Sequence, residues 1–164
     1  MATERSSRRI GNRVDHIAWI VKPENGPRSV KMLGDLFDTT FDFREGAAQG
    51  VGFDVWVAWS AGLEVVAPYA DGPGLAHEFY SFLQDRGEGF WGVIYGVDDL
   101  EAAAQRARDQ GWPVEPMLQS HDDQARKAIL SKWTKTVIDV KEVIVGEFAG
   151  TKLLLGQIEY PPDR

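Results

Sequence analysis

Short apolar segments alternate with amphipathic ones along the chain. Residues 14–21 are apolar and rich in β-branched and aromatic side chains, which is typical of a buried strand. Within residues 27–37 the apolar positions recur at helical spacing. Three further strand candidates follow, at residues 41–44, 51–59 and 63–67. The first half therefore predicts the order strand, helix and three strands.

The second half repeats this order after a bridging helix at residues 75–86. Residues 90–97 form an apolar strand candidate, and Asp98 can cap the next helix with Glu101 three positions later, as in a capping box. The predicted inward face of that helix consists of Leu100, Ala103, Ala104 and Ala107. The strand candidates that follow are residues 114–118, 136–148 and 153–160. The repeated β-α-β-β-β order indicates an internal duplication in an α+β protein.

Composition limits the classes of partner. The 164 residues suit one domain, at 13–164, after a polar, flexible N-terminal tail at 1–12. The net charge of −7 argues against nucleic acid or an anionic membrane as the main partner. No cysteine is present, which fits a cytoplasmic location, and no apolar run reaches the roughly 20 residues that span a bilayer.

Several short motifs carry a family resemblance. They are Asp15-His16-Ile17-Ala18, residues 63–68, residues 87–90, residues 97–102 and residues 158–161. On these motifs the chain resembles the vicinal oxygen chelate superfamily, which includes glyoxalases, extradiol dioxygenases, fosfomycin-resistance proteins and methylmalonyl-CoA epimerases. The epimerase branch is nearest, because of Gln49-Gly50-Val51 and the bridging helix that runs into Arg86-Gly87-Glu88-Gly89.

The resemblance implies two βαβββ modules whose curled mixed sheets surround one ligand cavity. Module one is then residues 13–69, the linker helix residues 74–87 and module two residues 88–161. The resemblance also implies a divalent metal held by one ligand on the first and last strand of each module. It further implies a homodimer, as in antibiotic-sequestering relatives.

The expected metal ligands are present in only one module. His16 and Glu64 fill the two positions of module one, whereas the matching positions of module two are Gly92 and Gly156, or Leu154 in a shorter alignment. Even catalytic zinc normally keeps three protein ligands. The sequence therefore predicts a degenerate half-site of His16 and Glu64, and no other cofactor.

Strand alternation predicts which residues line the cavity. If His16 faces the cavity, Ala18 and Ile20 on the same strand face it as well. By the same rule, Glu64 and Val66 face the cavity together. The middle strand has two faces, of which only one can face the cavity. One face carries Asp54, Trp56 and Ala58, and the other carries Phe53, Val55, Val57 and Trp59. We expect the first set, because the second is the more apolar core. The remaining predicted lining is Gly92, Ile94, Gly96 and Gly156, where missing side chains give a ligand room.

These residues predict an enzyme that acts on an apolar carbonyl compound. His16, helped by Glu64 or Asp54, would move a proton next to the carbonyl, as in an isomerase, lyase or cyclase. Two-base epimerisation of methylmalonyl-CoA is not expected, since the opposing carboxylate is replaced by Gly156.

Three alternatives stay open. His16 can be a structural histidine bonded to Glu64 or to the backbone. The chain can be a non-catalytic protein that binds or sequesters a small molecule. A third alternative is a metal enzyme whose ligand set is completed by His121, water or a second subunit. His77 lies early in the bridging helix and is expected at the surface.

Overall fold

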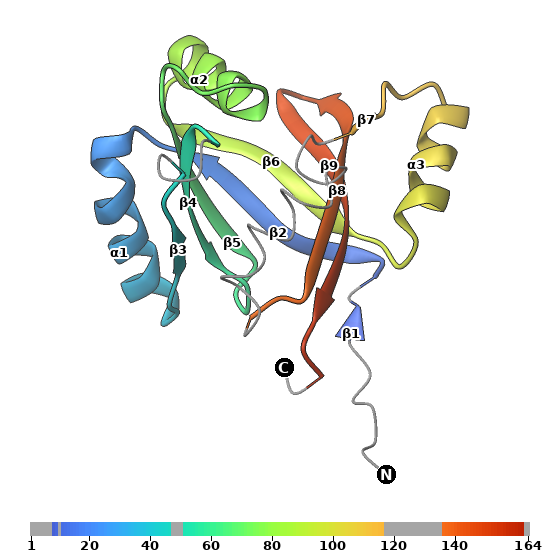
Figure 1. Ribbon diagram of the computed structural model, residues 1–164, viewed down its shortest axis with the longest axis horizontal. Helices are drawn as coiled ribbons and strands as arrows, with labels where there is room; N and C mark the ends of the chain where they lie inside the picture. Colours follow the sequence, from blue (N-terminus) through green and yellow to red (C-terminus); the bar gives the residue numbers. More distant parts are fainter. Residues whose placement is uncertain (1–7, 10, 47–50, 117–135, 163–164) are drawn as a thin grey trace. The chain divides into compact units, whose positions relative to one another are not determined.

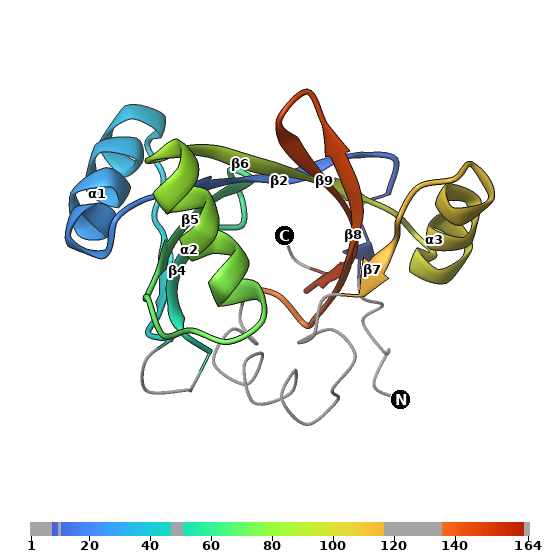
Figure 2. The same ribbon diagram turned by 90° about the horizontal axis from the view of Figure 1, so that it is seen from above.

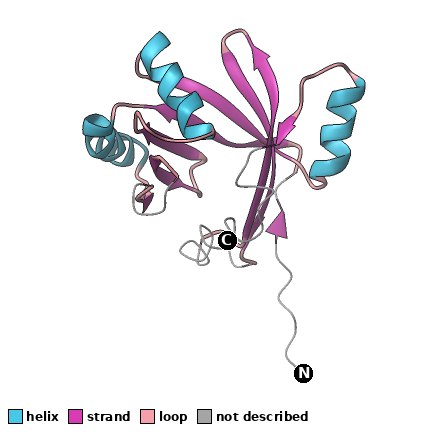
Figure 3. Ribbon diagram, turned by 45° about the horizontal axis from the view of Figure 1, so that its top comes forward, coloured by secondary structure: helices cyan, strands magenta, loops and turns pink. Residues whose placement is uncertain are grey.

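The computed structural model describes residues 8–9, 11–46, 51–116 and 136–162 (Figure 1). The chain divides into two compact units. The central unit is His16–Val93, and the terminal unit combines residues 1–15 with residues 94–164. Each unit contains both helices and strands (Figure 3). No helix in the described ranges is long and apolar enough to cross a membrane.

The central unit follows the predicted strand, helix and three strands. Its elements are β2 (Arg13–Ile20, of which the first three residues belong to the terminal unit), η1 (Pro23–Asn25), α1 (Gly26–Phe37), β3 (Asp42–Arg44), β4 (Phe53–Ala58), β5 (Leu63–Pro68) and α2 (Leu75–Arg86). The strand order is β3-β4-β5-β2. β2 runs parallel to β5, and the other neighbours are antiparallel. The parallel pair brings His16 and Glu64 onto neighbouring strands.

Helix α1 covers one face of this sheet (Figure 1). Val30 and Leu33 of α1 pack against a buried cluster that includes Trp56 and Val65. Leu36 and Phe37 also lie at helical spacing, but they expose 70% and 52% of their surface. The buried stripe of α1 is therefore narrower than its apolar content suggests.

Helix α2 packs beside β4 and β5 (Figure 2). Phe79 contacts the rings of Phe53 and Trp91 edge to face, with centroid distances of 5.2 and 4.8 Å. Leu83 is buried one turn later, whereas Phe82 is only half-buried under the Arg86 guanidinium. The predicted bounds of this helix are confirmed, and its aromatic side chains hold it on the sheet.

The terminal unit repeats the order of the central one. Its elements are β1 (Arg8–Arg9), the end of β6 (Gly89–Gly96), α3 (Leu100–Asp109), β7 (Glu115–Pro116), β8 (Asp139–Phe148) and β9 (Thr151–Tyr160). The strand order is β6-β9-β8-β7, and β1 pairs with the outer end of β9. The predicted α+β class and the two βαβββ runs are confirmed.

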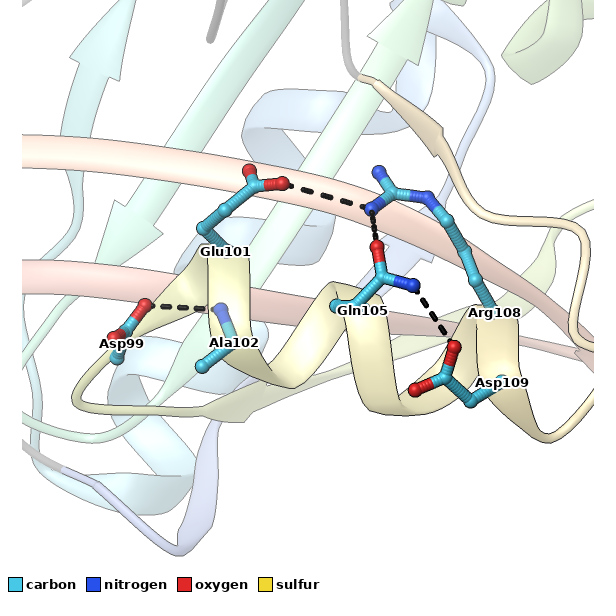
Figure 4. A network of polar contacts seen from close by, with 6 residues as sticks. All are labelled: Asp99, Glu101, Ala102, Gln105, Arg108 and Asp109. Carbon is cyan, nitrogen blue, oxygen red and sulfur yellow. Dashed lines mark hydrogen bonds and ion pairs between the residues drawn. The ribbon is translucent and has the colours of Figure 1, made fainter.

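The start of α3 differs from the sequence prediction by one residue (Figure 4). Asp99, not Asp98, is the N-cap, and its carboxylate accepts a hydrogen bond from the backbone N–H of Ala102 at 3.0 Å. Glu101 consequently lies inside the first turn and its carboxylate approaches Arg108 Nη1 at 3.6 Å. Two adjacent aspartates can each cap a helix, and only the extended backbone at Asp99 decides between them. The buried face of α3 is as predicted.

The hairpin between β8 and β9 turns at Ala149 and Gly150. Both residues have positive φ, 51° and 81°, and the flanking pair Phe148 and Thr151 closes the ladder. Two-residue turns of this kind favour Asn-Gly, because asparagine tolerates the left-handed region better than alanine. We expect Ala149→Asn to raise the free energy of unfolding by about 0.5 kcal/mol. Urea unfolding measures it, and a loss of stability would contradict the turn assignment.

Candidate functional site

The strand register of the central unit decides which side chains share a face. Glu64 on β5 lies opposite Ala18 on β2 and opposite Val57 on β4. Directly paired residues project to the same side of a sheet, and alternate residues along a strand follow them. We call this side the dyad face. Its members on the three strands include His16, Ala18, Ile20, Phe53, Val55, Val57, Glu64 and Val66.

His16 and Glu64 form a pair on the dyad face. His16 Nε2 lies 3.4 Å from Glu64 Oε2. The histidine side chain is 3% exposed, whereas the glutamate side chain keeps 21% of its surface in contact with solvent. The structure therefore brings together the two side chains that the sequence predicts as a pair, with the imidazole buried and the carboxylate partly in contact with solvent.

Apolar side chains surround the pair. Ala18, Ile20, Val57 and Val66 are each 0–1% exposed. The predictions that Ala18 and Ile20 share a face with His16, and Val66 with Glu64, are confirmed by the register. Such surroundings strengthen the electrostatic interaction between His16 and Glu64 relative to water.

The prediction for the middle strand is wrong. Asp54 pairs with Ala67, and Trp56 pairs with Val65, so both lie on the face opposite Glu64. Trp56 packs under α1, where the first atom of a side chain at Gly26 would come within 2.5 Å of its ring. The residues that share the dyad face are instead the more apolar set. Its members are Phe53, Val55, Val57 and, at the end of the strand, Trp59.

Asp54 has a structural role. Its Oδ2 accepts a hydrogen bond from the Tyr69 hydroxyl at 2.6 Å, and its Oδ1 accepts one from the backbone N–H of Gly46 at 2.8 Å. These bonds tie the end of β5 and the residues after β3 to β4. The catalytic role predicted for Asp54 does not fit this position, because its carboxylate is used on the other face.

The Asp54 carboxylate raises the pKa of Tyr69 to about 12, through the hydrogen bond first and burial second. A raised pKa stabilises the folded protein below the ordinary tyrosine value near 10. That contribution is lost as the pH rises from there through about 12. We expect the ultraviolet titration of tyrosinate to lose its step near 12 in Tyr69→Phe. In Asp54→Asn this step should move to lower pH, and an unchanged titration would contradict the assignment.

Known proteins share both sequence features and fold with this chain. The model of the Glyoxalase/Bleomycin resistance protein/Dioxygenase superfamily matches residues 15–128. The chain belongs to this superfamily. Its members include epimerases, isomerases and dioxygenases. A search of curated proteins finds no match.

Solved structures of superfamily members share the fold. Methylmalonyl-CoA epimerase from Mycobacterium tuberculosis is similar with a TM-score of 0.58 and 15% identity, over 95% of this chain and 94% of that one. A Streptomyces coelicolor methylmalonyl-CoA epimerase variant in complex with 2-nitronate-propionyl-CoA has a TM-score of 0.59 and 18% identity, over 90% of this chain and 97% of that one. These likenesses show that the chain has the same fold.

The predicted half-site of His16 and Glu64 stays a prediction. No three histidine, cysteine, aspartate or glutamate side chains in those ranges gather closely enough to hold a metal ion. His16 and Glu64 supply two ligands, one fewer than a typical catalytic zinc site. His121, the possible third ligand, lies outside the described residues, and His77 is exposed on α2.

Gly156 does not leave open space in the terminal unit. A side chain there would come within 2.8 Å of Ile94 Cγ2 and 3.5 Å of Glu142 Cγ. The prediction that this glycine makes room for a ligand is therefore wrong at this position, because Ile94 fills the room. Gly92 lies in the central unit, while Ile94 and Gly96 lie in the terminal unit. A ligand lining shared by these residues stays a prediction.

Glu142 is a carboxylate that sequence reasoning missed. It pairs with Gly156 across β8 and β9, and its Oε1 is buried. Val143 and Leu155, the next pair, pack towards α3, so Glu142 and Gly156 lie on the other face of the strands. Only the register could reveal this, because β8 has no alternation strong enough to place a single glutamate.

Proposed function

We propose that this superfamily member is an enzyme that transfers a proton next to the carbonyl group of a small molecule. The observation that carries the proposal is the buried contact of His16 Nε2 with Glu64 Oε2, at 3.4 Å on neighbouring strands. Histidine titrates near neutral pH, so its imidazole can accept and return a proton during one turnover.

Each member of the pair has a distinct task in this reaction. The neutral imidazole of His16 removes a proton from the carbon beside the carbonyl and becomes an imidazolium. Glu64 orients the ring and stabilises that positive charge. The imidazolium then returns the proton to a different atom of the resulting enolate, which gives an isomerisation, or it protonates a departing leaving group.

The proposed substrate is an apolar carbonyl compound. The dyad face next to the pair is largely apolar, with buried aliphatic side chains and the ring of Trp59, which favours an apolar ligand with few polar groups. One structurally similar protein is a methylmalonyl-CoA epimerase in complex with methylmalonyl-CoA and NH4+, so a thioester belongs in any test panel. A two-base epimerisation is not proposed, because Gly156 stands where the resemblance requires a second carboxylate.

We also propose that the enzyme works as a homodimer in the cytoplasm. The superfamily resemblance supports the dimer, and the absence of cysteine from the sequence supports the reducing compartment. Analytical ultracentrifugation tests the first point, and a mass equal to one chain across micromolar concentrations would contradict it.

Deuterium exchange tests the reaction even when its product is unidentified. The protein is incubated in heavy water with a panel of carbonyl compounds that includes methylmalonyl-CoA, and mass spectrometry counts the deuterium gained next to the carbonyl. For the compound that exchanges fastest, we expect His16→Gln to lower the rate about 100-fold, the usual scale for loss of a general base. His77→Gln, an exposed histidine on α2, is the matched control and should keep the wild-type rate.

The burial of His16 also favours a second candidate function. An imidazole that is only 2% exposed can serve as a fixed part of a binding surface in a protein that sequesters an apolar molecule. In that case a ligand binds tightly and is recovered without deuterium after long incubation. The same exchange experiment therefore separates the two functions.

A further inference from the structure

The ring of Trp59 lies directly against His16. The centroids of the two rings are 5.5 Å apart and their planes meet at 73°, an edge-to-face contact. Trp59 is 7% exposed and His16 is 2% exposed, so the contact is within the packed interior. An aromatic pair of this geometry stabilises the folded protein more than its buried area alone accounts for.

Backbone hydrogen bonds fix the place of Trp59. It follows the last residue of β4, at the start of the turn into β5, and the N–H of Ala61 donates to the carbonyl of Ala58 at 2.9 Å. In the same turn the carbonyl of Gly62 accepts from the N–H of Ile17 at 3.0 Å. The turn is thereby tied to β2 at the residue next to His16.

We propose that Trp59 is a positioning residue that holds the His16 imidazole against Glu64. This inference rests on the proposed function, for which it names a further residue. Glu64 reaches the ring at Nε2, and Trp59 packs against the same ring. The proton-transfer pair and Trp59 then form a unit of three side chains, from β2, β5 and the turn between β4 and β5.

The need for such a residue follows from the contact itself. A nitrogen–oxygen distance of 3.4 Å is long for a charge-assisted hydrogen bond, and the glutamate side chain is 21% exposed. Without the indole the imidazole could turn to another rotamer, and water could enter and screen the pair. The other charged residues that the register places on the dyad face, Asp42 and Arg44 of β3, lie beyond β4 from Glu64.

The electrostatic coupling between His16 and Glu64 measures this positioning. Nuclear magnetic resonance gives the pKa of His16 in the full chain, with His77→Gln and His121→Gln used to assign the signals. Glu64→Gln removes a nearby negative charge, and we expect it to lower the pKa of His16. In a Trp59→Leu background we expect Glu64→Gln to lower it by less than half as much.

Matched variants separate positioning from general packing. Trp91 is also buried in the central unit, at 2% exposed, and packs on Phe79, so Trp91→Leu should lose at least comparable stability but keep the full coupling. Trp59→Phe retains an aromatic ring and should also keep it. Trp59→Met fills the volume without a ring, should reduce the coupling, and replaces Trp59→Leu if that variant does not fold.

Three results would overturn the inference. They are an undiminished coupling in Trp59→Leu or Trp59→Met, an equal loss in Trp91→Leu, and the absence of any coupling in the wild type. The proposed function fails separately, if His16→Gln exchanges deuterium as fast as the wild type while the coupling still depends on Trp59.

Discussion

Gly46→Ala is expected to lower the free energy of unfolding by about 3 kcal/mol, at the upper end for overpacking a buried site. The first side-chain atom at position 46 would lie 1.5 Å from the carbonyl oxygen of Phe53 and 2.4 Å from its carbonyl carbon. Both are backbone atoms at the start of β4, so no side-chain rotation relieves the clash.

Moving the Phe53 backbone away from position 46 would also break a network of hydrogen bonds. The N–H of Gly46 donates to Asp54, and the carbonyl of Gly46 accepts from the N–H of Val51 at 3.2 Å. Urea unfolding measures the loss, with Gly89→Ala as the control, because a side chain at Gly89 meets nothing within 4 Å. Equal stability of the two variants would show that β3 and β4 do not approach as described.

Phe79→Ala is expected to cost about 3–5 kcal/mol of unfolding free energy, the range for deleting a buried aromatic ring. Phe79 is 4% exposed and contacts both Phe53 and Trp91, so its loss leaves a cavity between α2 and the sheet. Trp91 can fill little of this cavity, because it is itself held in β6.

Phe82 provides the comparison on the same helix. It is half-buried, and the guanidinium carbon of Arg86 lies over it, 5.6 Å from the centroid of the Phe82 ring. Phe82→Ala should therefore cost roughly 1 kcal/mol, the usual size of a partly exposed substitution. If both alanine variants lost the same stability, the packing of α2 on the aromatic cluster would be wrong.

The pairing of His16 with Glu64 was expected from the family resemblance, which implies one ligand on the first strand and one on the last strand of module one. Alternation then placed Ala18 and Ile20 on the same face as His16. A parallel pairing of β2 and β5 then brings the two side chains together, as the register shows. The fold class could also be predicted, because the order strand, helix and three strands occurs twice along the chain.

The face of β4 could not be predicted. Both of its faces are apolar, and Trp56 is 8% exposed on one side while Val57 is 1% exposed on the other. Hydrophobicity distinguishes a buried face from an exposed one, but it cannot distinguish two buried faces. The prediction that Asp54 and Trp56 share a face with Glu64 is wrong for that reason.

Glycines and turn residues limited the rest of the prediction. A glycine such as Gly156 fits an open ligand space and a tight contact with Ile94 equally well, and only coordinates separate the two. Trp59 lies one residue beyond β4, where alternation no longer applies reliably. Its contact with His16 depends on the turn geometry, which no local sequence pattern specifies.

The most direct test of the account is the rate of deuterium exchange in three variants, His16→Gln, Glu64→Gln and the double variant, with the compound that the wild type exchanges fastest. Residues that act as one unit have strongly non-additive effects on rate. We predict that the double variant is as slow as His16→Gln alone, about 100-fold below the wild type. A double variant slowed by the product of the two single effects, or a His16→Gln variant with the wild-type rate, would contradict the claim that this pair moves the proton.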